Sequence, residues 1–449
     1  MLKLLLLKGV ITQAEYDSAL SGKIPPSPTT PPLAFVRSKF ETELYGFMEL
    51  DTILDSTQSF NEPAGNAAIA EPQTYAGRHG RLMISDRHSR LGLKIAAADF
   101  HGVKASALVE VDFLGNQPST VTEFAFFSYG TLRMRHFLVK LETPVVDVLL
   151  GQWWALFGWQ NLFFPSSLQV QGMPGQLFQR IVQLRLSHLF KSDPVSLEIA
   201  AAAVRPPQRD SWAPDGQAGL RLLVNRRRGV RTIAATLTQV DALAVGVSGT
   251  VRRFSVPQFS ATPTSNVATA GWGIAVDSLI PLLSGSLEAR SNALTFTGSF
   301  MRGAGIADLY TGFAGGGLVT FPPLPNPTGA SPAPTYTSGV DNGLVTFGPD
   351  GRLHPVGWQG FILGLQYYLP PAGRLWLTGV YSQMHMTNAG TLGVASTVYT
   401  KSSFLSADLF WDATPALRFG AGYAWFRQQY ARGSIARNSR FQFSTYYLF

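Results

Sequence analysis

The stretch that decides the fold is the run Arg440-Phe441-Gln442-Phe443-Ser444-Thr445-Tyr446-Tyr447-Leu448-Phe449. In an extended strand, successive side chains point to opposite faces. One face of this strand therefore carries four aromatic residues, namely Phe441, Phe443, Tyr447 and Phe449, whereas the opposite face is partly polar. In water, such an aromatic strand face invites aggregation. A membrane β-barrel uses it, because aromatic side chains form girdles on the lipid-facing wall while the lumen stays polar.

The spacing of these aromatic residues also resembles the terminal signal by which bacterial outer-membrane barrels are recognised for insertion. That signal has an aromatic last residue, preceded by apolar residues at two-residue steps. We therefore regard Phe441, Phe443, Tyr447 and Phe449 as candidate residues of a membrane-insertion signal.

The composition agrees with a membrane barrel. The chain has 449 residues, of which 14% are charged, 44 are glycine and none is cysteine. A chain without cysteine suits an oxidising compartment that is reached unfolded. The mean hydropathy of +0.09 is too polar for a bundle of membrane helices. It fits a barrel, in which only alternate residues face lipid.

Two apolar segments need a separate interpretation. Residues 145–164 have the length of a transmembrane helix, but polar residues and glycines interrupt them, so we predict strand and turn. The apolar run at Met1–Lys8 is shorter than an export signal requires. We expect the export signal to lie upstream of this numbering or to have been removed.

The N-terminal region differs from the rest of the chain. Residues 1–21 predict a short periplasmic helical hairpin, whose second helix opens with the capping box Thr12-Gln13-Ala14-Glu15. Residues 22–39 are rich in proline and predict an extended linker. The hairpin either binds a periplasmic or outer-membrane partner or is a frayed end without one. Residues 40–449 are then predicted to form an outer-membrane β-barrel.

From about Phe40 onward the hydrophobic pattern has a period of two. Between Glu43 and Leu54, aliphatic residues alternate with polar and aromatic residues, which places the aliphatic set on the lipid side. Similar alternation marks further strands near 90–95, 103–113, 131–141, 145–157, 178–189, 195–204, 231–247, 271–280, 293–301, 358–368, 374–384, 404–411 and 416–426. We predict an all-β transmembrane fold, a closed antiparallel β-barrel of about 16 strands with a short N-terminal helical extension.

The connections divide into short and long ones. Residues 370–373 and 413–415 are short turns and are expected on the periplasmic side. Residues 57–80 and 312–352 are rich in glycine, proline and threonine and are expected to be external or infolded loops.

The formal net charge is +8, and many basic residues fall on the inner side of the predicted strands. Guanidinium groups bind carboxylate and phosphate bidentately, and a channel focuses their field. The candidate basic residues of the pore lining are Arg90, Lys94, Arg133, Arg135, Arg185, Arg418 and Arg440. They favour a lumen that attracts small anions.

The predicted lumen also contains acidic residues, which leave a second interpretation open. The candidate acidic residues of the pore lining are Glu49, Asp51, Glu110 and Asp112. Together with Glu43, they could pair with the arginines across the lumen and stiffen the wall without selecting a solute. The two interpretations are compatible.

The densest basic run is Arg226-Arg227-Arg228-Gly229-Val230-Arg231. Nucleic-acid binding is one interpretation of such a run, but no recognition helix or RNA-binding aromatic motif accompanies it. We favour a basic turn at the membrane boundary that contacts lipid headgroups or lipopolysaccharide, and we expect no nucleic-acid partner.

Catalytic signals are poor. The seven histidines show no metal-binding spacing, and the run Gly303–Asp308 lacks the third glycine of a dinucleotide loop. A GxSxG elbow is absent as well. We therefore expect no enzyme activity, no cofactor and no metal, although a hydrolase assembled from separate strands is a distant alternative. The tryptophans at 153, 154 and 159 are interpreted as interface anchors or as the packing of an infolded loop.

Several motifs resemble the DcaP-like porins, a family related in character to the phosphate-selective porins. The resemblance covers most of 1–160 and 270–449, whereas 205–270 is unmatched. The matching motifs are Leu6-Leu7-Lys8-Gly9-Val10-Ile11-Thr12, Tyr45-Gly46-Phe47-Met48-Glu49-Leu50-Asp51, Ser89-Arg90-Leu91-Gly92-Leu93-Lys94, Glu110-Val111-Asp112-Phe113-Leu114-Gly115, Leu132-Arg133-Met134-Arg135-His136, Leu150-Gly151-Gln152-Trp153, Gly271-Trp272-Gly273, Gly303-Ala304-Gly305-Ile306 and Phe419-Gly420-Ala421-Gly422-Tyr423.

This resemblance implies a homotrimeric channel of the Gram-negative outer membrane for small, often anionic solutes, with a periplasmic N-terminal extension. It makes Arg90, Lys94, Arg133 and Arg135 the positive residues of the lumen. The stretch Gly151-Gln152-Trp153-Trp154 departs from the family, which has smaller polar residues after the Gln, so the solute stays open. The alternative function is an outer-membrane scaffold whose N-terminal helices bind a partner while the pore is closed or gated.

Overall fold

The structure is a computed structural model that describes residues 40–118, 120–169, 173–310 and 339–449. The predicted N-terminal hairpin (1–21) and linker (22–39) lie outside the described residues. The same holds for most of the predicted loop 312–352, of which residues 339–352 are described.

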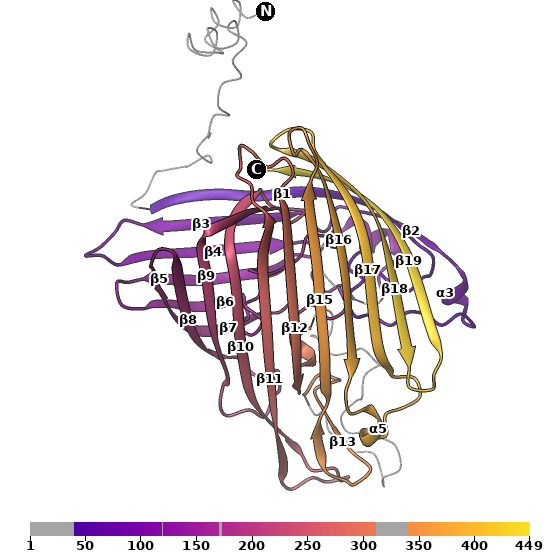
Figure 1. Ribbon diagram of the computed structural model, residues 1–449. Helices are drawn as coiled ribbons and strands as arrows, with labels where there is room; N and C mark the ends of the chain where they lie inside the picture. The colour runs from indigo at the N-terminus through magenta and orange to yellow at the C-terminus, as the bar shows by residue number, and fades with distance from the viewer. Residues whose placement is uncertain (1–39, 119, 170–172, 311–338) are drawn as a thin grey trace, which may run out of the picture.

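The described residues form one closed antiparallel barrel (Figure 1). Its sheet contains β1 (Phe40–Asp55), β2 (Arg81–Ser85), β3 (Arg90–Ala97), β4 (Lys104–Asp112), β5 (Arg133–Glu142), β6 (Asp147–Trp154), β7 (Arg180–Phe190), β8 (Val195–Val204), β9 (Asp215–Arg231), β10 (Gln239–Pro257), β11 (Asn266–Leu283), β12 (Leu294–Ala304), β15 (Gly357–Tyr368), β16 (Leu375–Met386), β17 (Tyr399–Asp412), β18 (Leu417–Tyr430) and β19 (Ile435–Leu448).

Closure joins the first strand to the last. β1 pairs with β19 from Phe47 opposite Leu448 to Asp55 opposite Arg440. β2 and β3 both pair with β1, one after the other along its length, so they occupy a single position in the wall. The 17 strands of the sheet among the described residues therefore form a barrel of 16 positions (17 − 1), as the alternation predicted.

Most predicted strands are confirmed, with one region misplaced. The predicted strand 231–247 spans the turn between β9 and β10, and β9 itself was missed. The basic run is the reason, since Ala242 pairs with Arg228 and the next residue, Leu243, pairs with Val224. The residues between Val224 and Arg228 form a bulge that breaks the alternation. The run thus belongs to the end of a strand rather than to a turn.

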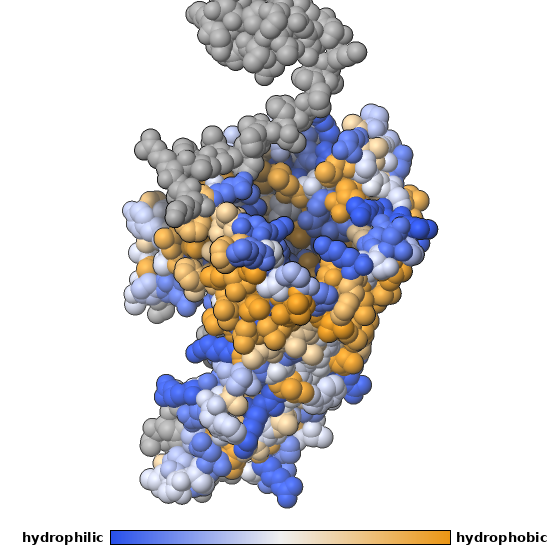
Figure 2. Space-filling model, turned by 90° about the vertical axis from the view of Figure 1, so that its left-hand side faces the viewer, coloured by the Kyte–Doolittle hydropathy of each residue, from blue (hydrophilic) through white to orange (hydrophobic). Residues whose placement is uncertain are grey.

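The outer wall is apolar. In β1, Leu44, Met48, Leu50 and Leu54 are exposed, whereas Phe47 is buried on the inner face. Hydrophobic side chains gather in a band across the face of the barrel shown in Figure 2, with hydrophilic side chains above and below it. A band of this kind is the lipid-facing surface of a membrane barrel. Among the described residues, no helix is long and apolar enough to cross a membrane.

The two ends of the barrel differ in their connections. The end near Phe40 and the C-terminus has short turns, such as 369–374, where Gly373 adopts a φ of 63° that favours glycine. The opposite end has the long connections, which hold α3 (Tyr75–Arg78), α4 (Glu123–Ser128), η1 (Ala307–Leu309), β13 (Val345–Phe347), β14 (Leu353–Pro355) and α5 (Ala389–Leu392). Short turns are periplasmic in such barrels, so the long connections lie on the external side.

Candidate functional site in the barrel lumen

The connection between β6 and β7 folds into the barrel, and we call it the lumen segment (155–179, described except for 170–172). Its start is held by β9 and β10: the N–H of Phe157 donates to Gln217 at 3.0 Å, and the N–H of Gly158 donates to Ser248 at 2.7 Å. The indole of Trp159 donates to the carbonyl oxygens of Leu220 and Val247, at 3.2 Å each. Trp159 therefore belongs to an infolded loop, one of the two predicted interpretations, whereas Trp154 is the last residue of β6 and is buried there.

Glycines explain why Trp159 can lie there. A Cβ added at Gly219 would lie 2.9 Å from Cε2 of Trp159, and one at Gly246 would lie 2.7 Å from its Cδ1. Both contacts are shorter than real Cβ atoms tolerate. Gly158, with a φ of 77°, provides the left-handed conformation that turns the chain into the lumen.

The lumen segment then crosses to the far wall. The side-chain amide of Gln169 donates to Gln442 of β19 at 2.7 Å, and the N–H of Phe178 donates to Leu309 at 2.9 Å. A second connection, 56–80, also folds inward in part. There the N–H of Ile69 donates to the side-chain oxygen Oε1 of Gln428 in β18 at 2.7 Å. These two segments narrow the lumen.

Arginines gather on the wall formed by β3, β4, β5 and β7, beside the lumen segment. Arg133 forms a bidentate pair with Asp112, at 2.6 and 2.9 Å. Arg135 bridges Glu110 at 2.7 Å and Asp112 at 2.9 Å. Arg90 approaches Glu110 at 3.5 Å. The predicted residues Arg90, Arg133, Arg135, Glu110 and Asp112 are thus brought together.

Arg180, which sequence reasoning missed, completes this group. Its guanidinium lies over the rings of Trp154 and Phe178, at 5.3 and 5.6 Å from their centroids. Its Nη1 is buried and has no hydrogen-bond partner in the part of the chain that the structure describes. We call Arg90, Arg133, Arg135, Arg180, Glu110 and Asp112 the arginine cluster. Four guanidinium groups against two carboxylates leave an excess of two positive charges (4 − 2) among these residues.

A cavity of about 410 Å³ lies in the lumen below this cluster, toward the short turns. Its lining includes the predicted residues Lys94 and Arg185, together with Lys140 and Arg221. Lys94 pairs with Glu43 at 2.7 Å, and Arg221 binds Glu198 at 2.9 Å. Arg185 donates to the carbonyl of Trp154 at 2.6 Å and to Gln183 at 3.0 Å. The cavity is therefore lined by four basic and two acidic side chains, the latter being Asp147 and Glu198.

The other predicted arginines lie in balanced ion pairs on the remaining wall. Arg440 binds both oxygens of Asp55, at 2.6 and 2.9 Å, and Arg418 binds Asp412 at 2.7 Å. We call the following residues the closed ion pairs: Arg252, Arg290, Arg418 and Arg440 with Asp55, Asp215, Asp308 and Asp412. Their formal charges cancel, four against four.

The remaining predicted residues are placed apart from the arginines. Glu49 and Asp51 face inward from β1 and lie beside His88. Phe441, Phe443, Tyr447 and Phe449 are exposed on the outer wall, as the alternation predicted, and their role in insertion stays a prediction.

Several surface ion pairs lie on the external connections, and one of them joins two of these connections. Glu71 accepts hydrogen bonds from Arg432 and, at 2.7 Å, from Ser434, which joins the connection 56–80 to the turn between β18 and β19. The hydrogen bond from Arg432 holds the pKa of Glu71 below its usual value.

The closed barrel, its apolar outer band and its infolded lumen segment define an outer-membrane β-barrel of the porin type. No protein-family model matches the chain, and no curated protein matches its sequence. Its fold is similar to that of the outer membrane channel DcaP of Acinetobacter baumannii, with a TM-score of 0.65 and 14% identity over 91% of this chain and 97% of that chain. It is also similar to an anion-selective porin from Comamonas acidovorans, with a TM-score of 0.51 and 10% identity over 91% of this chain and all (100%) of that chain.

The predicted resemblance to DcaP-like porins is thus confirmed at the level of the fold. Both solved structures are described as a channel or a porin, in line with the expectation of a channel rather than an enzyme.

Proposed function

We propose that the protein is a passive diffusion channel that prefers small anionic solutes, such as carboxylates or phosphate. The observation that carries this proposal is the uncompensated charge of the arginine cluster, which lies beside the narrowed part of the lumen. A fixed positive potential raises the local concentration of anions and lowers that of cations.

The acidic residues support this function rather than oppose it. Glu110 and Asp112 hold Arg133 and Arg135 in fixed positions, so the guanidinium groups do not have to be ordered when a solute arrives. Because only two carboxylates are present for four arginines, pairing stiffens the wall and still leaves net charge. Both interpretations of the sequence therefore apply to the same residues.

The cavity gives such a solute space next to the cluster. Its volume of about 410 Å³ accommodates a small carboxylate with part of its hydration shell. Lys94 and Arg185 in its lining extend the positive surface toward the short turns. Phosphate and carboxylate satisfy this chemistry equally, so the proposal is for the anion class.

Homotrimeric assembly and contact with outer-membrane lipid or lipopolysaccharide belong to the same proposal. Their support is the likeness of the fold to a DcaP channel and the apolar outer wall. The alternative function, a scaffold that binds a partner through its N-terminal helices, depends on residues 1–32, which lie outside the described residues.

Planar-bilayer recording of the purified protein across a salt gradient tests the proposal. We expect conductance steps in threes and a reversal potential of the anion-selective sign. Replacing Arg133→Gln and Arg180→Gln together removes two positive charges but keeps Arg135 on its carboxylates. A charge about 10 Å from the ion path contributes about 0.4 kcal/mol in water-like surroundings, so the anion-to-cation permeability ratio should fall roughly tenfold.

Arg253→Gln is the matched control, because Arg253 is an exposed arginine on the outer face of β10. It should leave the permeability ratio unchanged. Folded protein that inserts without conductance would contradict the channel. A conducting channel whose selectivity is the same in the double variant would contradict the role of the arginine cluster.

A further inference from the structure

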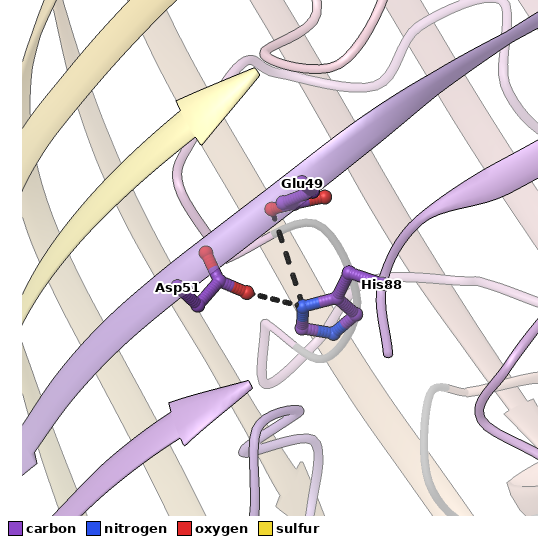
Figure 3. A group of neighbouring side chains, drawn as sticks. All are labelled: Glu49, Asp51 and His88. Atoms are coloured by element: carbon purple, nitrogen blue, oxygen red, sulfur yellow. Dashed lines mark hydrogen bonds and ion pairs between the residues drawn. The ribbon is translucent and has the colours of Figure 1, made fainter. Parts of the chain in front are cut away.

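The break between β2 and β3 creates a second polar group in the lumen wall, separate from the arginine cluster. Both strands pair with β1, but residues 86–89 leave the ladder. This break places the imidazole of His88 against Glu49 and Asp51, which lie two residues apart on the inner face of β1 (Figure 3). Nδ1 of His88 lies 2.6 Å from an Asp51 oxygen and 4.0 Å from a Glu49 oxygen.

The carboxylate of Glu49 is poorly satisfied by its surroundings. The residue is 2% exposed, and among the described residues neither of its oxygens accepts a hydrogen bond of good geometry, although the buried hydroxyl of Tyr446 interacts with it. A buried carboxylate without hydrogen bonds costs several kcal/mol unless a cation compensates it. In Figure 3 this carboxylate points toward the same ring nitrogen as Asp51.

We propose that Glu49, Asp51 and His88 bind one divalent transition-metal ion of the Zn²⁺ class in the wall of the lumen. Around a tetrahedral zinc ion, nitrogen and oxygen ligands lie about 3.3 Å from one another. The two separations from Nδ1 of His88, 2.6 and 4.0 Å, fall on either side of that value, and the three ligand atoms all lie within 4.8 Å of one another, so side-chain movements can bring them to it. On binding, the ion replaces the proton on Nδ1 of His88, and this proton leaves to solvent.

The donor set selects the kind of metal. One imidazole and two carboxylates suit Zn²⁺, Ni²⁺ or Cu²⁺, whereas Mg²⁺ and Ca²⁺ prefer ligand sets made of oxygen. The neighbours of Asp51 orient it for this role. Oδ1 of Asp51 accepts hydrogen bonds from Ser444 at 2.5 Å and from Gln442 at 3.1 Å. Its other oxygen, Oδ2, is left directed at His88.

The ion would also fix the broken strand. His88 belongs to the break, and both carboxylates belong to β1, so a shared metal ties the break to the continuous strand beside it. Binding neutralises two carboxylates in the lumen wall. This site is therefore expected to raise the stability of the barrel, because a ligand that binds only the folded state stabilises it.

The test is zinc binding to the full-length protein in detergent after removal of metals with EDTA. Zn²⁺ is added to the folded barrel and, separately, during refolding, since the three side chains are buried. We expect one Zn²⁺ per chain in at least one preparation, and Co²⁺ in its place should give the visible absorption of a four-coordinate site. Equal amounts of Mg²⁺ should not displace the zinc.

Glu49→Gln and His88→Gln should each weaken zinc binding by roughly tenfold or more. Ser444→Ala removes the hydrogen bond to Asp51 and the one that Ser444 accepts from Gln442 but leaves all three ligands in place. It should weaken zinc binding less and serves if the first two variants do not fold. His354→Ala is the matched control, because His354 pairs with Asp350 at 2.9 Å on an exposed loop. Absence of zinc in both preparations, displacement by Mg²⁺, or equal binding by all variants would overturn the proposal.

Discussion

The arginine cluster and the closed ion pairs contain the same kinds of residue, but in different proportions. In the cluster, four arginines share two carboxylates, whereas in the closed ion pairs four arginines meet four aspartates. A balanced buried pair produces little field at a distance, so it acts on the wall around it. An unbalanced group acts on ions that pass. The selectivity of a lumen therefore depends less on how many arginines it contains than on how many of them lack a carboxylate partner.

Breaking a closed ion pair should have the largest effect, and it should be an effect on stability. Arg440→Met leaves the fully buried Asp55 without its bidentate partner. Removal of one partner of a buried pair destabilises by about 3–5 kcal/mol, because an uncompensated charge remains. We expect a lower urea midpoint for unfolding in detergent, followed by gel mobility, and an unchanged permeability ratio in the molecules that fold.

Two further variants separate charge from packing in this prediction. Asp55→Leu combined with Arg440→Met should recover much of the lost stability, because no charge is then left alone. Arg437→Met, an exposed arginine on the outer face of the same strand, should have little effect. If the single and double variants were equally unstable, shape rather than charge would explain the role of this pair.

In the arginine cluster, the corresponding acid substitution should act on selectivity. Asp112→Asn removes one of two negative charges but keeps an oxygen that can accept from Arg133. The excess positive charge rises by one, so the anion-to-cation permeability ratio should increase by about fourfold, on the same estimate of about 0.4 kcal/mol per ion. This change is opposite in sign to that expected for Arg133→Gln and Arg180→Gln.

Measurement of the reversal potential decides this prediction. Asp412→Asn is a comparable substitution among the closed ion pairs, where Asp412 meets Arg290 and Arg418. It should cost stability and change the ratio less, because its pairs lie away from the narrowed lumen. If Asp412→Asn changed the permeability ratio more than Asp112→Asn does, the assignment of the selective charge to the arginine cluster would be contradicted.

The two regions also differ in how far the sequence predicts them. Alternation predicted the inward direction of Arg133, Arg135, Arg418 and Arg440, because lipid on one side and the lumen on the other impose a period of two. It failed for Arg180, the first residue of β7, whose guanidinium packs over the rings of Trp154 at the end of β6 and Phe178 of the lumen segment.

The ion-pair partners of the arginines were harder to predict than the side of the barrel wall to which each arginine points. Arg290 meets Asp412, which is 122 residues away in the sequence, through a connection between strands rather than through strand pairing. The strand β9 was missed for a related reason, since the bulge at its basic run interrupts the period of two. Register, bulges and infolded connections decide which charges meet, and none of them leaves a local pattern.

The smallest effect on stability is expected at the ion pair between Glu71 and Arg432. This pair lies on the external loops, open to solvent, unlike the arginine cluster and the closed ion pairs. The hydrogen bond from Arg432 lowers the pKa of Glu71. A carboxylate with a lowered pKa stabilises the folded loop above its ordinary pKa, and this contribution is lost as the pH falls through the folded value. The protection of amides in residues 69–74 and 431–434, measured relative to their intrinsic exchange rate at each pH, should therefore fall below about pH 4.

Glu71→Gln should remove this pH dependence, because the amide does not titrate. Glu123→Gln is the control, since Glu123 also pairs with an arginine, Arg81, but on another loop. It should leave the pH dependence of residues 69–74 intact. Protection factors that do not change with pH in the unmodified protein would show that solvent already screens this pair, as it does for many surface ion pairs. The contrast between buried and exposed arginines would then rest on burial alone.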